Sequence, residues 1–151
     1  MLRPLNMRPA ATTDCEIIAK HRHFSGSASR VDLANYALWV SGSIEEGTYL
    51  GVLEEREGSV VAGIGLTILN WGPVRGSASP YRGRIVNAFT DEVWRARGIG
   101  SSLLKSILEA GRSRGVDAFC LAATPMSRRL YERVGFVTYD EEMRLGSKRT
   151  W

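Results

Sequence analysis

The chain has 151 residues, of which 44% are hydrophobic and 24% are charged, and this is the composition of an ordinary globular protein with a core of its own. No stretch approaches the ~20 consecutive apolar residues of a membrane-spanning helix, so a helical membrane protein is excluded. The formal net charge of +4 favours anionic partners, such as phosphate esters, nucleic acid or an acidic surface, without choosing among them.

The cysteines and the first residues indicate the compartment. Only Cys15 and Cys120 could pair, and their spacing indicates neither a disulfide framework nor a CxxC metal site. Two free thiols fit a reducing compartment. The first ten residues lack the long apolar run of a signal peptide. We therefore expect a cytoplasmic protein without a membrane partner, and we expect Cys120 to be buried and unreactive in a short apolar strand.

The first part of the chain is predicted to form a short strand and two helices. A strand within Met1–Arg8 would end at Pro9, because proline has no amide hydrogen to pair. Thr13 and Glu16 have the T-x-x-E spacing of a capping box, which predicts that a helix begins there. After the Gly/Ser patch Ser25–Ser29, apolar residues recur at helical spacing in a second helix, at Leu33, Ala37, Val40 and Ile44.

The middle of the chain changes to the pattern of strands. Tyr49–Glu54 and Ser59–Leu69 are predicted strands joined by a tight turn at Arg56–Gly58. Asn70–Gly83 has several Gly and Pro interruptions and is predicted to be a loop, long enough to be a candidate lid. Ile85–Phe89 is the next predicted strand.

The last part holds the clearest helix of the sequence. Within Gly98–Ser113, Ile99, Leu103 and Ile107 are four residues apart, and Gly115 is placed to end the helix. A short strand, a helix opened by proline and two final strands are predicted to follow, at Ala118–Ala122, 125–133, Phe136–Tyr139 and Glu142–Leu145. This order predicts a mixed α/β (α+β) domain and not a strictly alternating doubly wound one.

The most informative segment is Arg95–Ser101, which lies between a predicted strand and the amphipathic helix. Gly98 and Gly100 let the backbone approach a ligand without a β-carbon in the way. The free amides of the helix's first turn face the same point, where the helix dipole is positive. Together these features suit a pyrophosphate, and Arg95 and Arg97 add positive charge.

Other interpretations of this glycine pair fit less well or stay open. A dinucleotide site is disfavoured because the third glycine of G-x-G-x-x-G is missing and the glycines do not directly follow the strand. No G-x-x-x-x-G-K-[ST] run is present, so a Walker-type nucleotide site is absent. An ordinary loop leading into a helix would explain the two glycines alone.

Two motifs together resemble one family. The run R-x-x-G-x-G at Arg95–Gly100 resembles the acetyl-CoA signature of the GNAT superfamily of N-acetyltransferases, and L-Y-E-R-V-G-F at Leu130–Phe136 is similar to the family's L-Y-E-K-x-G-F run. The resemblance is strong from Ile85 to Phe136 and looser from Met7 to Leu69. It implies a GNAT-like fold, with a central twisted, mostly antiparallel sheet of about six to seven strands flanked by four helices. It further implies a single domain over residues 1–151, with 146–151 as a flexible tail.

The resemblance also implies the chemistry. It implies acetyl-CoA as co-substrate, no metal, a primary amine of a small molecule or peptide as acceptor, and a homodimer as a common assembly. Thr124 departs from the family, which often has asparagine there. The residues at the family's cofactor-binding positions are Phe89, Thr90, Arg95, Arg97, Gly98, Ile99, Gly100, Ser101 and Thr124.

Tyr131 matches the tyrosine that lies next to the CoA sulfur in many members, and it is the predicted catalytic residue. A phenol with a pKa near 10 stays protonated at neutral pH and can donate to a thiolate whose conjugate acid has a pKa of about 8.5. Without the motif, a core tyrosine packed at a helix end would be the ordinary interpretation.

The remaining polar and aromatic residues leave their roles open. His21 and His23 are two apart on a helix and cannot both bind one metal ion, so we expect them at the surface or as caps. Asp91 and Glu92 could serve as a base, and Glu45 and Glu46 could shape an amine pocket. Carboxylates at such positions are more commonly solvated. Aromatic residues that could line an acceptor pocket are Tyr36, Trp39, Trp71 and Tyr81.

Two functions from other classes are alternatives to acyl transfer. A basic nucleic-acid-binding module would explain the charge, but the arginines are spread over several elements and do not form one stripe interleaved with aromatic residues. The other alternative is a sensor that binds acyl-CoA in the same fold without turnover.

Overall fold

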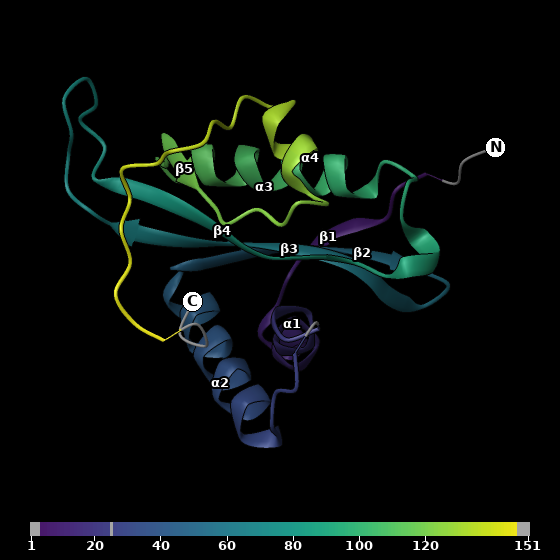
Figure 1. The fold of residues 1–151 in the computed structure, drawn as a ribbon. Helices are drawn as coiled ribbons and strands as arrows, with labels where there is room; N and C mark the ends of the chain where they lie inside the picture. The colour runs from purple at the N-terminus through teal and green to yellow at the C-terminus, as the bar shows by residue number, and fades with distance from the viewer. Residues whose placement is uncertain (1–3, 25, 148–151) are drawn as a thin grey trace.

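The alternating apolar residues of the middle of the chain form the centre of a five-stranded sheet (Figure 1). The computed structural model describes residues 4–24 and 26–147. Strands β1 to β4 pair antiparallel in chain order, and β5 joins the edge of β4 in parallel. The bounds are β1 Met7–Pro9, β2 Tyr49–Arg56, β3 Ser59–Asn70, β4 Tyr81–Thr90 and β5 Ala118–Cys120. The mixed α/β class is thus confirmed.

Four α-helices cover the two faces of this sheet. Figure 1 shows α1 and α2 on one face and α3 and α4 on the other. The bounds are α1 Cys15–Arg22, α2 Arg30–Glu46, α3 Ile99–Ser113 and α4 Arg128–Glu132, with short 3₁₀ turns η1 at Thr12–Asp14 and η2 at Glu92–Trp94. Within the described residues, no helix combines the length and apolarity that a membrane crossing requires.

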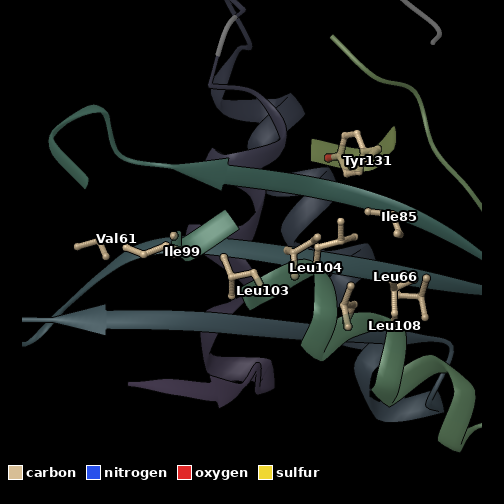
Figure 2. Close-up of a cluster of buried hydrophobic side chains, with 11 residues drawn as sticks. Val61, Leu66, Ile85, Ile99, Leu103, Leu104, Leu108 and Tyr131 are labelled. Carbon is tan, nitrogen blue, oxygen red and sulfur yellow. The ribbon is translucent and has the colours of Figure 1, made fainter. Parts of the chain in front are cut away.

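The larger part of the core lies between α3 and the sheet. The predicted four-residue spacing buries one side of α3, and Leu103, Leu104 and Ile107 are each at most 1% exposed. Figure 2 shows Leu103 and Leu104 meeting residues of β3 and β4, with Tyr131 of α4 at the edge of the cluster. The partners of α3 in the sheet are Val61, Ala62, Ile64, Leu66 and Ile85.

A smaller core joins α1 and α2 to the other face, through Ile18, Val40 and Tyr49. The predicted helix after the Gly/Ser patch is confirmed, and a reciprocal capping box begins it: Ser29 Oγ accepts the Asp32 amide (3.1 Å) and the Asp32 carboxylate accepts the Ser29 amide (2.8 Å).

The capping box predicted at Thr13 and Glu16 is wrong, because α1 begins at Cys15 with Asp14 as its cap. The Asp14 carboxylate accepts the Ala11 amide (2.8 Å) and binds Arg8 (2.8 Å), so it closes the preceding turn instead. Bonding to the Arg8 guanidinium lowers the pKa of Asp14. The carboxylate at the cap position therefore makes no capping hydrogen bond to α1.

The C-terminal segment differs most from prediction. Phe136–Tyr139 and Glu142–Leu145 are not strands, so the sheet has five strands and not six to seven. The apolar side chains that suggested them are exposed, Val137 at 86% and Leu145 at 95%. An alternating pattern gives a strand only where a sheet edge pairs with it, and this segment forms no ladder with β5.

Two predicted elements are shorter than expected, and parts of the predicted first strand and tail lie outside the described residues. The helix expected over 125–133 is shorter, because the carbonyl of Thr124 first accepts the amides of Ser127 and Arg128 in a turn (3.1 Å each). The loop expected at 70–83 spans only 71–80, because both flanking strands extend into it. Residues 1–3 of the predicted first strand, Ser25, and residues 148–151 of the predicted tail lie outside the described residues.

Candidate active site

The site begins where β4 and β5 separate. The two strands pair only from Arg82 to Arg84 on β4, opposite Ala118–Cys120 on β5. Beyond these pairs a cleft of about 700 Å³ opens, and it reaches both faces of the sheet, because α1 and α3 each contribute to its wall. A second hollow of about 660 Å³ lies between β5 and residues 134–144, and Tyr131 is the only predicted site residue in its wall. We therefore take the first cleft as the candidate site.

A bulge in β4 shapes one wall of the cleft. Val86 pairs with Gly65 and Phe89 with Gly63, so Asn87 and Ala88 together face a single residue of β3. Asn87 has a φ of +57°, in the left-handed region that asparagine adopts more readily than most residues. The bulge bends the strand at the edge of the cleft.

Hydrogen bonds between Asn87 and two tyrosines, one on α2 and one on β2, hold this bulge. The Asn87 side chain is buried, and its Nδ2 donates to the hydroxyls of Tyr36 on α2 and Tyr49 on β2 (3.0 Å each). Burial raises the pKa of both phenols, that of Tyr49 beyond its usual range, so both stay protonated. The conformation of β4 at the cleft is thus fixed from the α2 face.

The other wall is the turn before α3. Gly98 caps the helix with a φ of +79°, and the first helical hydrogen bond runs from Ser102 N–H to Gly98 O (3.2 Å). The amides of Ile99, Gly100 and Ser101 come before that bond and have no acceptor within the helix. Arg95 Nε donates to the carbonyl of Thr90 (3.0 Å), which fastens the turn to the end of β4.

Packing does not explain the two glycines of this turn. A β-carbon at Gly98 would have no neighbour within 4 Å, and one at Gly100 would be 3.5 Å from Leu130 Cδ2, an ordinary contact. The space in front of these residues is therefore open, which is the arrangement that an anion bound by backbone amides needs.

Most residues predicted to bind the cofactor meet in this cleft. Those in its wall are Phe89, Thr90, Arg95, Gly98, Ile99, Gly100 and Thr124. Arg97 and Ser101 are not in the wall: the Arg97 guanidinium lies over the Trp94 ring, 4.9 Å from its centre, and Ser101 is exposed on α3. The roles assigned to all of these residues stay predictions.

Tyr131 stands at the junction of α4 with the cleft. It is 6% exposed and packs edge-on against Phe136, with ring centres 5.8 Å apart. Burial raises the pKa of its phenol. In the described part of the chain, no protein group hydrogen-bonds to its hydroxyl, so no protein acceptor holds its proton.

His21 is the functional candidate that sequence analysis missed. It was expected at the surface or as a cap, but it is 4% exposed and lines the cleft, stacked on Phe89 with ring centres 4.6 Å apart. Burial lowers its pKa to about 4, against an opposing effect of the Asp91 charge, so the ring is neutral at pH 7. Its spacing from the buried Ile18 and the partly buried Ile17 was the available signal, since positions three and four apart share a helix face.

The imidazole has space because of a glycine on the strand beneath it. A β-carbon at Gly63 would be 3.0 Å from Nδ1 of His21 and 2.7 Å from Leu53 Cδ2. His23, in contrast, takes the cap position at the end of α1, as expected.

The other aromatic candidates lie near opposite ends of β4, and only some of them are close to the cleft. Tyr36 reaches the bulge, and Trp39 packs on Tyr36 and Tyr49. Trp71 and Tyr81 lie at the opposite end of β4 and are not in the cleft wall. The 71–80 loop is held at that end by hydrogen bonds to the turn after α3: the Ser79 hydroxyl donates to the Gly115 carbonyl, and the Ser77 hydroxyl donates to the Asp117 carboxylate. Among the carboxylates considered, Glu45, Glu46 and Glu92 are exposed and Asp91 is half-buried beside the cleft.

The described residues contain no cluster of three or more His, Cys, Asp or Glu that could hold a metal ion. The burial expected for Cys120 is wrong: it is exposed at the end of the edge strand β5, where Arg84 Nη1 approaches its sulfur (3.5 Å). An edge strand has a neighbour on one side only, which explains this exposure.

A curated relative shares part of this sequence. A curated glucosamine 6-phosphate N-acetyltransferase of Trypanosoma brucei brucei is 32% identical over 63 residues, which are 42% of this chain and 43% of the relative. The match thus spans less than half of that protein.

Two solved structures extend the likeness to nearly the whole chain. A GCN5-related N-acetyltransferase from Ralstonia eutropha has a TM-score of 0.81 and 29% identity, covering 94% of this chain and 98% of the other. A predicted acetyltransferase with acetyl-CoA from Clostridium acetobutylicum shares the fold with a TM-score of 0.85 and 19% identity, covering 95% and 96%. The sequence matches the acetyltransferase (GNAT) family over residues 16–136. The chain belongs to this family and is an acyltransferase.

Proposed function

We propose that the protein transfers the acetyl group of acetyl-CoA to a primary amine of a small molecule or peptide, by direct attack of the amine on the thioester. One observation carries the proposal: Tyr131 lines the same cleft as the first turn of α3 and the end of β4. These are the groups that diphosphate binding, acyl positioning and protonation of a leaving thiolate require.

The residues present fit the cofactor. The open space in front of Gly98 and Gly100 lets a diphosphate reach the amides of Ile99, Gly100 and Ser101, where the helix dipole is positive. When bound, acetyl-CoA supplies an activated acetyl thioester. The backbone around Phe89 and Thr90, after the bulge, supplies polar groups that orient the acyl arm.

Tyr131 is the proposed proton donor to the departing sulfur. Its raised pKa keeps the proton on the phenol at neutral pH, and its side chain is in the cleft wall. Since α1 lies on the sheet face opposite α3 and α4, we place the acceptor amine on the α1 side and the coenzyme on the α3 side (Figure 1).

Thermal stability tests the coenzyme site first. A ligand that binds only the folded protein adds about 2.7 kcal/mol at 100 times its Kd, which would raise the melting temperature clearly. Release of free thiol with a panel of amines then tests turnover. A melting temperature unchanged by saturating CoA would contradict the proposal, and CoA binding without thiol release on any amine would favour a sensor.

A matched pair of glycine variants locates the site. Gly98 and Gly115 lie at the two ends of α3 with φ of +79° and +83°, so replacement by alanine strains both similarly. We expect Gly98→Ala to weaken CoA binding by about tenfold or more, about 1.4 kcal/mol, because it displaces the amides of the turn. Gly115→Ala is expected to lower stability to a similar extent while leaving the Kd for CoA unchanged. Equal effects of the two variants on that Kd would count against this turn.

A further inference from the structure

An unpaired cation stands on the α1 side of the cleft. Arg22, in the last turn of α1, is in the cleft wall, and its guanidinium lies over the Tyr36 ring, 5.5 Å from the ring centre. Tyr36 is itself hydrogen-bonded to Asn87 (3.0 Å), so the surface on which Arg22 rests is fixed. Within residues 4–24 and 26–147, no carboxylate pairs with Arg22.

The rest of this wall lacks a carboxylate among the described residues, and the Asp91 carboxylate lies half-buried beside the cleft, where its charge acts on His21. Beside Arg22 stand the neutral His21 and the aromatic rings of Phe24 and Phe89, whose centres are 5.2 Å apart. A polycationic acceptor would therefore meet the unpaired charge of Arg22 with no carboxylate in the described part of the wall itself to offset it.

The other two arginines of the wall have different places. Arg95 is fastened to the Thr90 carbonyl, on the turn before α3. Arg84 lies where β4 still pairs with β5, beside Cys120. Arg22 is thus the charged group that an acceptor entering from the α1 side meets.

We infer that the acceptor is an amine that also carries an anionic group, a carboxylate or a phosphate, which Arg22 binds while the amine points toward Phe89 and Thr90. The inference rests on the proposed function. A planar guanidinium can donate two parallel hydrogen bonds to either anion, and such charge-assisted pairs are about twice as strong as neutral ones. The stack on Tyr36 holds the guanidinium in place beforehand, which reduces the entropy lost on binding.

Matched acceptors test the class. Thiol release from acetyl-CoA is measured for three pairs that differ only in the anionic group: phosphoethanolamine and ethanolamine, phenylalanine and phenylalaninamide, glucosamine 6-phosphate and glucosamine. Spermidine serves as the polycation. We expect kcat/KM to be about tenfold or more higher for the anionic member of at least one pair, and the three pairs distinguish phosphate from carboxylate.

A charge-matched variant pair assigns the effect to Arg22. Arg22→Gln and Lys20→Gln each remove one positive charge from the exposed surface of α1, and only Arg22 is in the cleft wall. We expect Arg22→Gln to lower kcat/KM about tenfold for the preferred anionic amine, mainly through KM, while its neutral partner changes less than about twofold. Lys20→Gln is expected to leave both values unchanged.

Three results would overturn the inference: preference for the neutral member in every pair, preference for spermidine, or equal effects of Arg22→Gln and Lys20→Gln. Turnover of none of these amines, with CoA still raising the melting temperature, would overturn the acceptor class and leave the coenzyme site standing. Loss of the CoA effect as well would instead reject the proposed function.

Discussion

On the α3 side, the ligand-binding groups that we propose are mainly backbone amides, whereas on the α1 side they are side chains that come from separate elements. The α3 side depends on the amides after Gly98 and on the turn fastened to Thr90. The α1 side depends on His21 and Arg22 of α1, together with Asn87 of β4. A binding surface formed by consecutive backbone amides has a contiguous sequence motif, whereas one formed by side chains from distant elements has none.

The largest expected effect concerns Tyr131, where the two sides meet. Tyr131→Phe removes the proposed proton donor and is expected to lower kcat by about 100- to 10,000-fold, with the Kd for CoA changed less than about twofold. Because burial raises the phenol pKa, the wild-type rate is expected to show no loss from Tyr131 deprotonation below about pH 10. Thiol release and calorimetry measure the two quantities.

The control is Tyr139→Phe, which changes an exposed tyrosine of the C-terminal segment and should leave kcat unaltered. If Tyr131→Phe kept the wild-type kcat, the motif tyrosine would be a packing residue and the chemistry would belong to the α1 side.

His21 gives the next largest effect, on stability. Its pKa is about 4 in the folded protein against 6.5 when exposed, so the unfolded chain binds a proton that the folded protein rejects between these values. Stability from His21 is therefore complete above pH 6.5 and is lost as the pH falls toward 4, by about 3 kcal/mol in total. Urea unfolding at pH 7 and pH 4.5 should show this loss in the wild type and a shallower pH dependence in His21→Gln.

One feature separates this effect from the titration of Asp14. The carboxylate of Asp14 has a pKa lowered below 3.8, so its contribution is lost at lower pH than that of His21. Parallel curves for the wild type and His21→Gln would mean that the imidazole is solvated, and the α1 side of the cleft would then be more open than the structure has it.

The smallest effect concerns Asn87, which holds the bulge of β4 from the α1 side of the cleft. Asn87→Gly retains the backbone freedom of the bulge and removes the hydrogen bonds to Tyr36 and Tyr49, which we expect to cost about 1–3 kcal/mol. Asn87→Ala adds the strain of a left-handed alanine, about 1 kcal/mol more. Urea unfolding compares the two. Equal stabilities would show that β4 relaxes its bulge, and the two sides would then be less tightly coupled.

The α3 side could be predicted from the sequence because local rules determine it. Four-residue apolar spacing predicts α3, and the glycine pair at its beginning predicts the open turn. Both signals lie within 16 consecutive residues and do not depend on a distant partner. The strands around the Arg56–Gly58 turn were predicted for the same reason.

The α1 side could not be predicted, because its geometry depends on contacts between remote residues. His21 meets Phe89 only after α1 packs on the sheet, and Asn87 meets Tyr36 only when β4 forms its bulge. The wrong predictions share this cause. The final strands needed a sheet edge to pair with, and α1 begins at Cys15, after the turn that Asp14 closes with Arg8 and the Ala11 amide.

The hydrogen bonds of Asn87 have a consequence for how the protein can diverge. Arg22 and Phe24 are exposed and take no part in those bonds, so selection can exchange them with little penalty to folding and thereby change which amine is favoured. Tyr36 is different, since its hydroxyl holds the bulge, and losing it disturbs the strand against which the coenzyme is proposed to lie. In related proteins that act on other amines, we therefore expect the residues at the end of α1 to be substituted more often than Tyr36.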